Sequence, residues 1–86
     1  MPQISRFLGI KIYFYYNDHP PPHFQAIYGE HKADFDINTL GIISGKLPNR
    51  VRALVVEWAA SHQDELRENW QRARQGLPLR KIPPLV

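Results

Sequence analysis

Hydrophobic and polar residues alternate along three stretches in the first half of the chain, over residues 10–15, 23–28 and 32–37. An alternation with period two is typical of a β-strand that buries one face and exposes the other. We therefore expect a three-stranded antiparallel sheet. The hydrophobic positions are Ile10, Ile12 and Phe14 in the first stretch, Phe24, Ala26 and Tyr28 in the second, and Ala33, Phe35 and Ile37 in the third.

The dipeptide Gly29-Glu30 separates the second stretch from the third and predicts a two-residue turn of type II′. Such a turn places Tyr28 opposite His31 and thereby fixes how the two strands pair. Both faces of the resulting register bring together residues of matching chemistry, which favours it. The predicted pairs are Ala26 with Ala33 and Phe24 with Phe35 on the inner face, and Gln25 with Asp34 and His23 with Asp36 on the outer face.

From about residue 46 the hydrophobic period becomes that of a helix. Asn49 is a suitable N-cap, and Gly76 followed by Pro78 ends the pattern. We favour one continuous or kinked helix, about 39 Å long at 1.5 Å per residue. The alternative is a pair of helices that meet near Ser61, which would then be the N-cap of the second helix. The hydrophobic stripe consists of Val51, Leu54, Val55, Trp58, Leu66, Trp70 and Ala73.

The last ten residues, 77–86, are rich in proline and cannot be helical, but they are hydrophobic enough to pack on the rest of the chain. We expect an edge strand or an extended arm laid on the sheet. The predicted fold class is α+β, with a three- or four-stranded antiparallel sheet packed against one long or kinked C-terminal helix. We interpret residues 1–86 as a single domain with a β part (1–45), a helical part (46–76) and an extended tail (77–86).

Composition narrows the range of functions. With 86 residues, 43% of them hydrophobic, the chain has room for one small core, so association with a second copy or with a partner protein is an expectation. The absence of cysteine excludes disulfides and cysteine nucleophiles and fits a reducing cytoplasm. The first residues lack a signal-peptide pattern, and the hydrophobic run 7–16 is too short to span a membrane. We therefore expect a cytoplasmic protein without a membrane segment.

The outer face of the predicted sheet combines aromatic, basic and amide side chains. Tyrosine rings on an open sheet can stack on nucleic-acid bases while a nearby lysine meets phosphate. The alternative is that these tyrosines pack across the sheet or under the tail, because tyrosine is a good strand residue. The candidate RNA-binding residues are Lys11, Tyr13, Tyr15 and Gln25.

Two histidines flank a three-proline segment, residues 20–22, that leads into the second strand. Prolines restrict the backbone, so this loop holds His19 and His23 in a limited set of positions. A carboxylate at Asp36 could orient the His23 ring for proton transfer, which makes His23, Asp36 and His19 the candidate catalytic residues. The alternative is an ordinary cross-strand pair on the protein surface. No motif of the Walker, Rossmann or zincin type is present, and we expect no cofactor and no metal.

Several short motifs, in order along the chain, resemble those of the bacterial domain-of-unknown-function family 4160. That resemblance implies a component of a two-gene module, often beside a member of family 2442, and hence a toxin–antitoxin type of system. Members usually have His-Phe-His where this chain has His23-Phe24-Gln25, so a metal site of three histidines is not supported here. The motifs are Met-Pro-x-Ile-Ser-x-Phe-x-Gly-Ile, Asp18-His19-x-Pro-Pro-His23-Phe24, Tyr28-Gly29-Glu30, Glu57-Trp58-Ala59, Glu65-Leu66-x-x-Asn69-Trp70 and Pro78-Leu79-x-Lys81-Ile82-x-Pro84-Leu85.

Two functional hypotheses follow from the residues and the resemblance together. The first is a small cytoplasmic component of a bacterial toxin–antitoxin-like module that is directed at RNA through the open face of the sheet. The second is a non-catalytic binding or regulatory module that docks on a protein partner encoded by an adjacent gene. Both interpretations of His23, Asp36 and His19 stay open at this point, so the sequence does not decide whether the protein is an enzyme.

Overall fold

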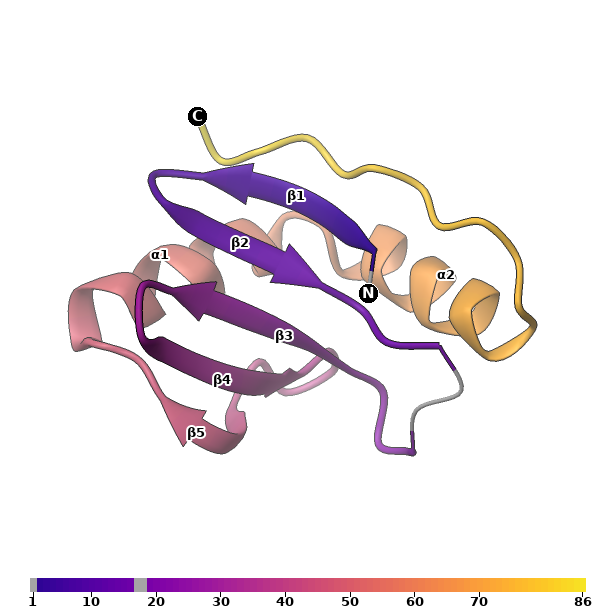
Figure 1. Cartoon of the computed structure of the whole chain (residues 1–86), viewed down its shortest axis with the longest axis horizontal. Coiled ribbons are helices and arrows are strands. Elements are labelled where there is room, and N and C mark those ends of the chain that lie inside the picture. Colours follow the sequence, from indigo (N-terminus) through magenta and orange to yellow (C-terminus); the bar gives the residue numbers. More distant parts are fainter. Residues whose placement is uncertain (1, 17–18) are drawn as a thin grey trace.

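The computed structural model describes residues 2–16 and 19–86; Met1, Asn17 and Asp18 lie outside the described residues, and with them the Asp18 position of the family resemblance. An antiparallel sheet with strand order β1-β2-β3-β4-β5 forms one layer, and two helices lie together behind it (Figure 1). None of the helices in this described part is long and apolar enough to cross a membrane. The elements are β1 (Gln3–Phe7), β2 (Ile10–Tyr13), β3 (His23–Tyr28), β4 (His31–Asp36), β5 (Ile42–Lys46), α1 (Asn49–Ala60) and α2 (Gln63–Arg74).

The predicted α+β class and the β3–β4 hairpin are confirmed. Gly29 has a φ of 58°, as the first central residue of a type II′ turn requires. Phe24, Ala26, Ala33 and Phe35 are buried as predicted, whereas Tyr28 beside the turn is 37% exposed. The Phe24 and Phe35 rings stack with their centroids 5.3 Å apart. All the predicted cross-strand pairs are present, namely Tyr28 with His31, Ala26 with Ala33, Gln25 with Asp34, Phe24 with Phe35 and His23 with Asp36.

The predicted number of strands was wrong, because the sheet has five strands rather than three or four. β1 pairs with β2 through a turn at Leu8 and Gly9, whose φ angles of 51° and 79° match the type I′ hairpin turn. Its alternation is broken where the register shifts between Gln3 and Ser5, so that the consecutive residues Ile4 and Ser5 are both buried. This irregularity hides the strand from a search for period two.

β5 was also missed, because it is an edge strand with little hydrophobic alternation. Its register with β4 shifts between Asp34 and Phe35, and four of its five residues are exposed. Gly45 has a φ of 85°, and a Cβ atom there would lie 2.3 Å from the Lys32 carbonyl oxygen. Only glycine therefore allows β5 to approach β4 so closely at this point.

The helical segment consists of two helices, so the prediction of one continuous or kinked helix was wrong and the alternative was correct. A single helix of about 39 Å would be longer than the whole molecule, whose greatest extent is 33 Å. The break also differs in detail from the predicted caps. Ser61 ends α1 and His62 is the N-cap of α2, while Pro48, rather than Asn49, is the N-cap of α1.

The tail is an extended arm rather than an edge strand, and it lies beside β1 (Figure 1). The Ile82 N–H donates to the Ile4 carbonyl at 2.9 Å, and the Ile82 side chain is buried. Asn69 of α2 is only 1% exposed and forms two hydrogen bonds with the backbone of Arg80. Its Nδ2 donates to the Arg80 carbonyl at 2.8 Å, and its Oδ1 accepts from the Arg80 N–H at 2.9 Å. The Asn69 side chain thus pairs with the tail much as a strand would.

We predict that Asn69→Ala destabilises the fold by about 1 to 3 kcal/mol, because it removes the two hydrogen bonds that the buried Asn69 amide makes with the backbone of Arg80. Unfolding in urea, followed by circular dichroism, measures this loss. Gln71→Ala is the matched control, since it removes an amide from an exposed position on the same helix. Equal stability of the two variants would contradict the assigned role of Asn69.

A second pair of variants tests the close approach of β5. Gly45→Ala should cost more stability than Gly29→Ala, by about 1 kcal/mol or more, because steric overlap with Lys32 adds to the strain of a left-handed backbone. Gly29 shares that backbone conformation, at a φ of 58°, but a Cβ there would meet no atom within 4 Å. The same unfolding measurement gives the difference, and equal losses would mean that β5 is not held against β4 as described.

Candidate functional site

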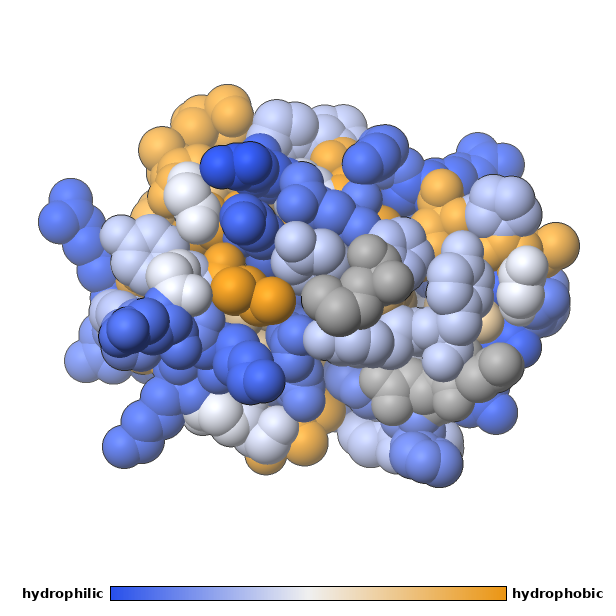
Figure 2. All heavy atoms as spheres, viewed as in Figure 1, coloured by the Kyte–Doolittle hydropathy of each residue, from blue (hydrophilic) through white to orange (hydrophobic). Residues whose placement is uncertain are grey.

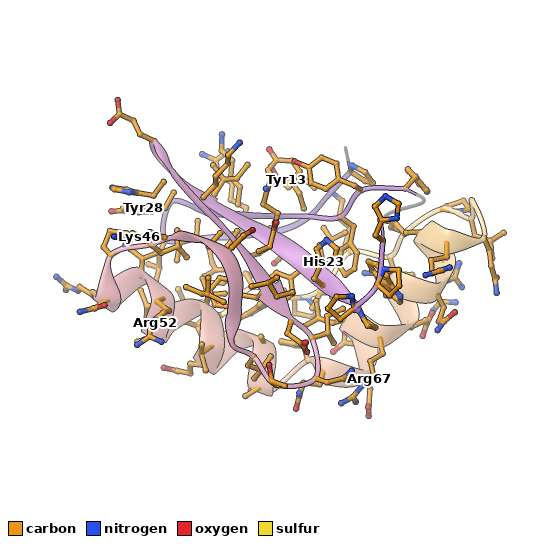
Figure 3. The ribbon with its side chains drawn as sticks, turned by 90° about the horizontal axis from the view of Figure 1, so that it is seen from below. Tyr13, His23, Tyr28, Lys46, Arg52 and Arg67 are labelled. Atoms are coloured by element: carbon orange, nitrogen blue, oxygen red, sulfur yellow. The ribbon has the colours of Figure 1, made fainter. Side chains whose placement is uncertain are left out.

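The face of the sheet opposite the helices is open, and its side chains are mostly hydrophilic (Figure 2). In the view from below, Tyr13 lies on this open side, whereas Arg52 and Arg67 project from the helical layer (Figure 3). The side-chain alternation of β2 and β3 produces this separation, since the residues between the buried positions point to the open face.

A basic row crosses this face from β1 to β5, perpendicular to the strands. Neighbouring strands lie about 4.8 Å apart, so the five register positions span about 19 Å. Four of the five are basic, and the exception is Ile27 in the centre. Within residues 2–16 and 19–86 none of the four forms an ion pair; the arginine ion pairs found there involve Arg67, Arg72 and Arg80. The basic row is Arg6, Lys11, Ile27, Lys32 and Lys46, each the register partner of the next.

A polar row runs beside the basic row, and hydrogen bonds join its members laterally. Gln25 Nε2 donates to one Asp34 oxygen at 3.2 Å, and the Ser44 hydroxyl donates to the other at 3.0 Å. Tyr13 donates to Gln3 Oε1 at 3.3 Å, and the hydroxyl of Tyr15, which follows the end of β2, donates to Gln25 Oε1. The polar row is Gln3, Tyr13, Gln25, Asp34 and Ser44.

Three of the four candidate RNA-binding residues lie in these two rows, and the fourth, Tyr15, is hydrogen-bonded to a member of the polar row. Lys11 is in the basic row, Tyr13 and Gln25 are in the polar row, and Tyr15 is bonded to Gln25. Three further basic residues were not included in the predicted site. Lys32 was on the predicted outer face. Arg6 and Lys46 belong to β1 and β5, the two strands that the sequence did not predict, and the pairing of these strands aligns both residues with Lys11.

The predicted pair His23 and Asp36 is present as a backbone pair, but the described contacts of the two side chains lie elsewhere. Asp36 Oδ1 accepts hydrogen bonds from the N–H groups of Asn38 and Thr39, at 2.7 and 2.9 Å, and so holds the turn that leads to β5. The His23 ring lies 5.2 Å from the Trp70 ring of α2. A catalytic role for Asp36 stays a prediction.

His19 and His23 border the same pocket, which has a volume of about 180 Å³. Pro20 and Pro21 form its wall between the two histidines, and Asp34 and Ile43 complete it. The carboxylate that lines this pocket is therefore Asp34, which the sequence had placed opposite Gln25 rather than beside His23. A second hollow, of about 290 Å³, shares Asp34 and extends along the sheet to Lys32, Ser44 and Gly45.

The His23 ring has a defined tautomer. Its Nδ1 lies 2.7 Å from the Pro21 carbonyl oxygen, which can only accept a hydrogen bond. Nδ1 therefore carries a proton, and in the neutral ring the lone pair is on Nε2. Among residues 2–16 and 19–86, no three histidine, aspartate or glutamate side chains converge in a way that could hold a metal ion.

Comparison with curated proteins and with solved structures gives no match. A comparison with family models gives a match over residues 9–71, which include β2 to β5, α1 and most of α2. The matched family is described as a domain of unknown function. The match covers well over half of the chain, so this protein belongs to the domain-of-unknown-function family DUF4160.

Proposed function

We propose that the protein is an RNA-directed component of a bacterial two-gene, toxin–antitoxin-like module and that it binds single-stranded RNA across the open face of the sheet. The basic row is the observation that carries the RNA part of this proposal. The bacterial module rests on the resemblance of the sequence motifs to the family. The comparisons support membership of the family itself.

Electrostatics favours a phosphate backbone along the basic row. Its cations form no ion pair among the described residues, so no carboxylate within ion-pair distance neutralises them. Asp34 lies in the adjacent polar row, where hydrogen bonds from Gln25 and Ser44 hold its carboxylate in place. A negative charge there repels phosphate and therefore directs the backbone of a bound strand toward the basic row.

The groups beside the basic row suit bases rather than phosphates. Tyr13 and Tyr15 are half-buried, so each keeps part of its ring accessible, and both hydroxyls are anchored by hydrogen bonds to glutamine side chains. Anchored rings can stack on bases with little loss of side-chain entropy. An open sheet surface offers flat stacking area to unpaired bases, which supports a single strand as the ligand rather than a duplex.

We predict that replacing both Lys11 and Lys32 by alanine weakens binding to an oligoribonucleotide and flattens its salt dependence. Each lost phosphate contact should reduce the slope of log affinity against log salt by about 0.7 for a single strand. Fluorescence anisotropy with a labelled oligoribonucleotide at several salt concentrations measures the slope. Arg52→Ala is the matched control, because this exposed arginine lies on the helical side of the molecule (Figure 3). An unchanged slope in the double variant would refute binding along the basic row.

The module part of the proposal makes a separate prediction in cells. Induced expression of the protein should arrest growth, co-expression of the adjacent gene should relieve the arrest, and the Lys11 and Lys32 double variant should be harmless. Culture density after induction reports the effect, with the abundance of each variant checked by immunoblot. Normal growth with abundant wild-type protein would count against a toxin-like role.

A hydrophobic hollow favours a second candidate function, docking on a protein encoded by the adjacent gene. It has a volume of about 240 Å³ and lies where the turns of the two hairpins meet the start of α1. Leu8 is 55% exposed and Tyr28 is 37% exposed there. An apolar side chain flanked by a carboxylate would fit, since Arg50 stands at the hollow. In this case Leu8→Ser should abolish co-purification with the adjacent gene product but leave RNA binding unchanged.

A further inference from the structure

We propose that the sheet edge formed by β5 is a docking site for an extended peptide segment of another protein, which adds to the sheet as a further strand. The segment carries an acidic side chain beside Lys46 and an apolar side chain beside Ile43. This inference names a surface other than the hollow at Leu8 and the chemistry of its partner. It does not depend on RNA binding, because it rests on the backbone and side chains of β5.

The two edges of the sheet differ in what covers them. β1 forms one edge, and the tail lies along it: the Ile82 N–H donates to the Ile4 carbonyl at 2.9 Å, and Lys81 Nζ donates to the Gln3 carbonyl at 2.9 Å. β5 forms the other edge, and no described element lies beyond it (Figure 1). The tail shows how an extended segment lies against an edge of this sheet, and β5 is the edge that the chain itself leaves uncovered.

The backbone of β5 has hydrogen-bonding groups that the fold does not use. In an antiparallel pair, alternate residues direct their N–H and C=O groups to the neighbouring strand, and the residues between them direct theirs away. β5 pairs with β4 on one side, and within residues 2–16 and 19–86 no hydrogen bond reaches the main chain of residues 42–46 from the other side. Such a row of donors and acceptors is a template for another strand.

An apolar contact is available at one end of this edge. Ile43 is the extra residue where the register of β5 with β4 shifts, and it is 47% exposed. It lines the pocket that His19 and His23 border, the histidine pocket, to which Pro20 and Pro21 contribute an apolar wall. Cross-strand neighbours lie about 5 Å apart, so an apolar side chain on an added strand can cover Ile43 and reach this wall.

Charge at the other end favours an acidic residue. Lys46 is exposed, Lys32 is its register partner on β4, and neither forms an ion pair among the described residues. A carboxylate beside Lys46 on an added strand would be attracted by both ammonium groups. Ser44 donates to Asp34, so a second carboxylate is better placed beside Lys46 than beside Ser44.

A second copy of this chain fits the β5 edge less well. Pairing of two β5 strands would bring together two sets of Lys32 and Lys46, in a protein whose formal net charge is +3. Lysine on an edge strand is one means by which proteins prevent pairing with copies of themselves. The same lysines attract a segment of opposite charge, so the edge selects an acidic partner.

The test uses a synthetic peptide, acetyl-Thr-Glu-Thr-Val-Thr-Val-Thr-amide, in which the glutamate and both valines share one face when the peptide is extended. Titration into isotope-labelled protein, followed by NMR, should shift the amide signals of residues 42–46. Hydrogen exchange should slow at those β5 amides that do not face β4. A peptide with lysine in place of glutamate should bind about two- to fivefold more weakly, as expected for an exposed ion pair.

Two N-methylated forms of the peptide test for main-chain pairing. One is methylated at the glutamate and valine amides, and the other at the threonine amides. Only alternate amides of an added strand face β5, so one form should bind about tenfold or more weakly than the other. Equal affinities would mean that the peptide binds through its side chains alone, which would overturn strand addition.

Protein variants test the side-chain contacts. Lys46→Glu should weaken binding of the glutamate peptide and strengthen binding of the lysine peptide. Arg52→Glu makes the same change in net charge on the helical side of the molecule and should alter neither affinity as much (Figure 3). Ile43→Ser should weaken binding of both peptides, whereas Leu8→Ser, at an exposed apolar residue of the other hollow, should leave it unchanged.

Three further results would overturn the proposal. The first is the absence of peptide binding at millimolar concentration. The second is binding with shifts along the basic row but without protection of β5, which would place the peptide on the open face. The third is a dimer of the protein alone, detected by analytical ultracentrifugation, in which the β5 amides are already protected. That result would assign the edge to a second copy of the chain.

Discussion

Burial of the Trp58 side chain is the interaction on which the arrangement of layers depends. The ring is completely buried and lies 5.4 Å from Phe7 of β1 and 6.0 Å from Phe24 of β3. Its Nε1 donates to the Pro83 carbonyl at 2.8 Å, which gives the buried N–H the partner that it requires. One side chain of α1 thus joins the outer strand, the central strand and the tail, and the helix break beside it brings His62 to 5.6 Å from the same ring.

The chemistry of the open face follows from this core. Because Ile10 and Ile12 are buried against the helical layer, Lys11 and Tyr13 between and beside them must point to the other side. A slip of one residue in β2, β3 or β4 would bury these polar groups and expose core residues, so hydrophobic packing specifies the register of the rows over these three strands. The basic row is therefore aligned by hydrophobic packing, although none of its four cations takes part in that packing.

The basic row and the histidine pocket occupy different parts of one surface. The basic row collects cations, the polar row holds Asp34 through Gln25 and Ser44, and the histidine pocket lies at the far side of Asp34 from Lys32. His23 is also linked to the helical layer through Trp70. Trp70 lies on the same helix as Asn69, which grips the tail. The position of the His23 ring therefore depends on the same packing that fixes the tail.

The sequence by itself determined the α+β class, the β3–β4 register and the approximate limits of the helical segment, because each depends on neighbours in the chain: a two-residue turn, a period of two and a helix-ending glycine. It also placed Lys11, Tyr13 and Gln25 on one face. Only the tertiary structure decided that β1 and β5 form the outer strands, that the helical segment is divided in two, and that Asn69 binds the tail. Their signals are weak locally, since bulges interrupt the alternation in β1 and at β5, and their partners are distant, as with Ile4 and Ile82. For the same reason Arg6 and Lys46 complete the basic row, and Asp34 rather than Asp36 lines the pocket, only once the chain has folded.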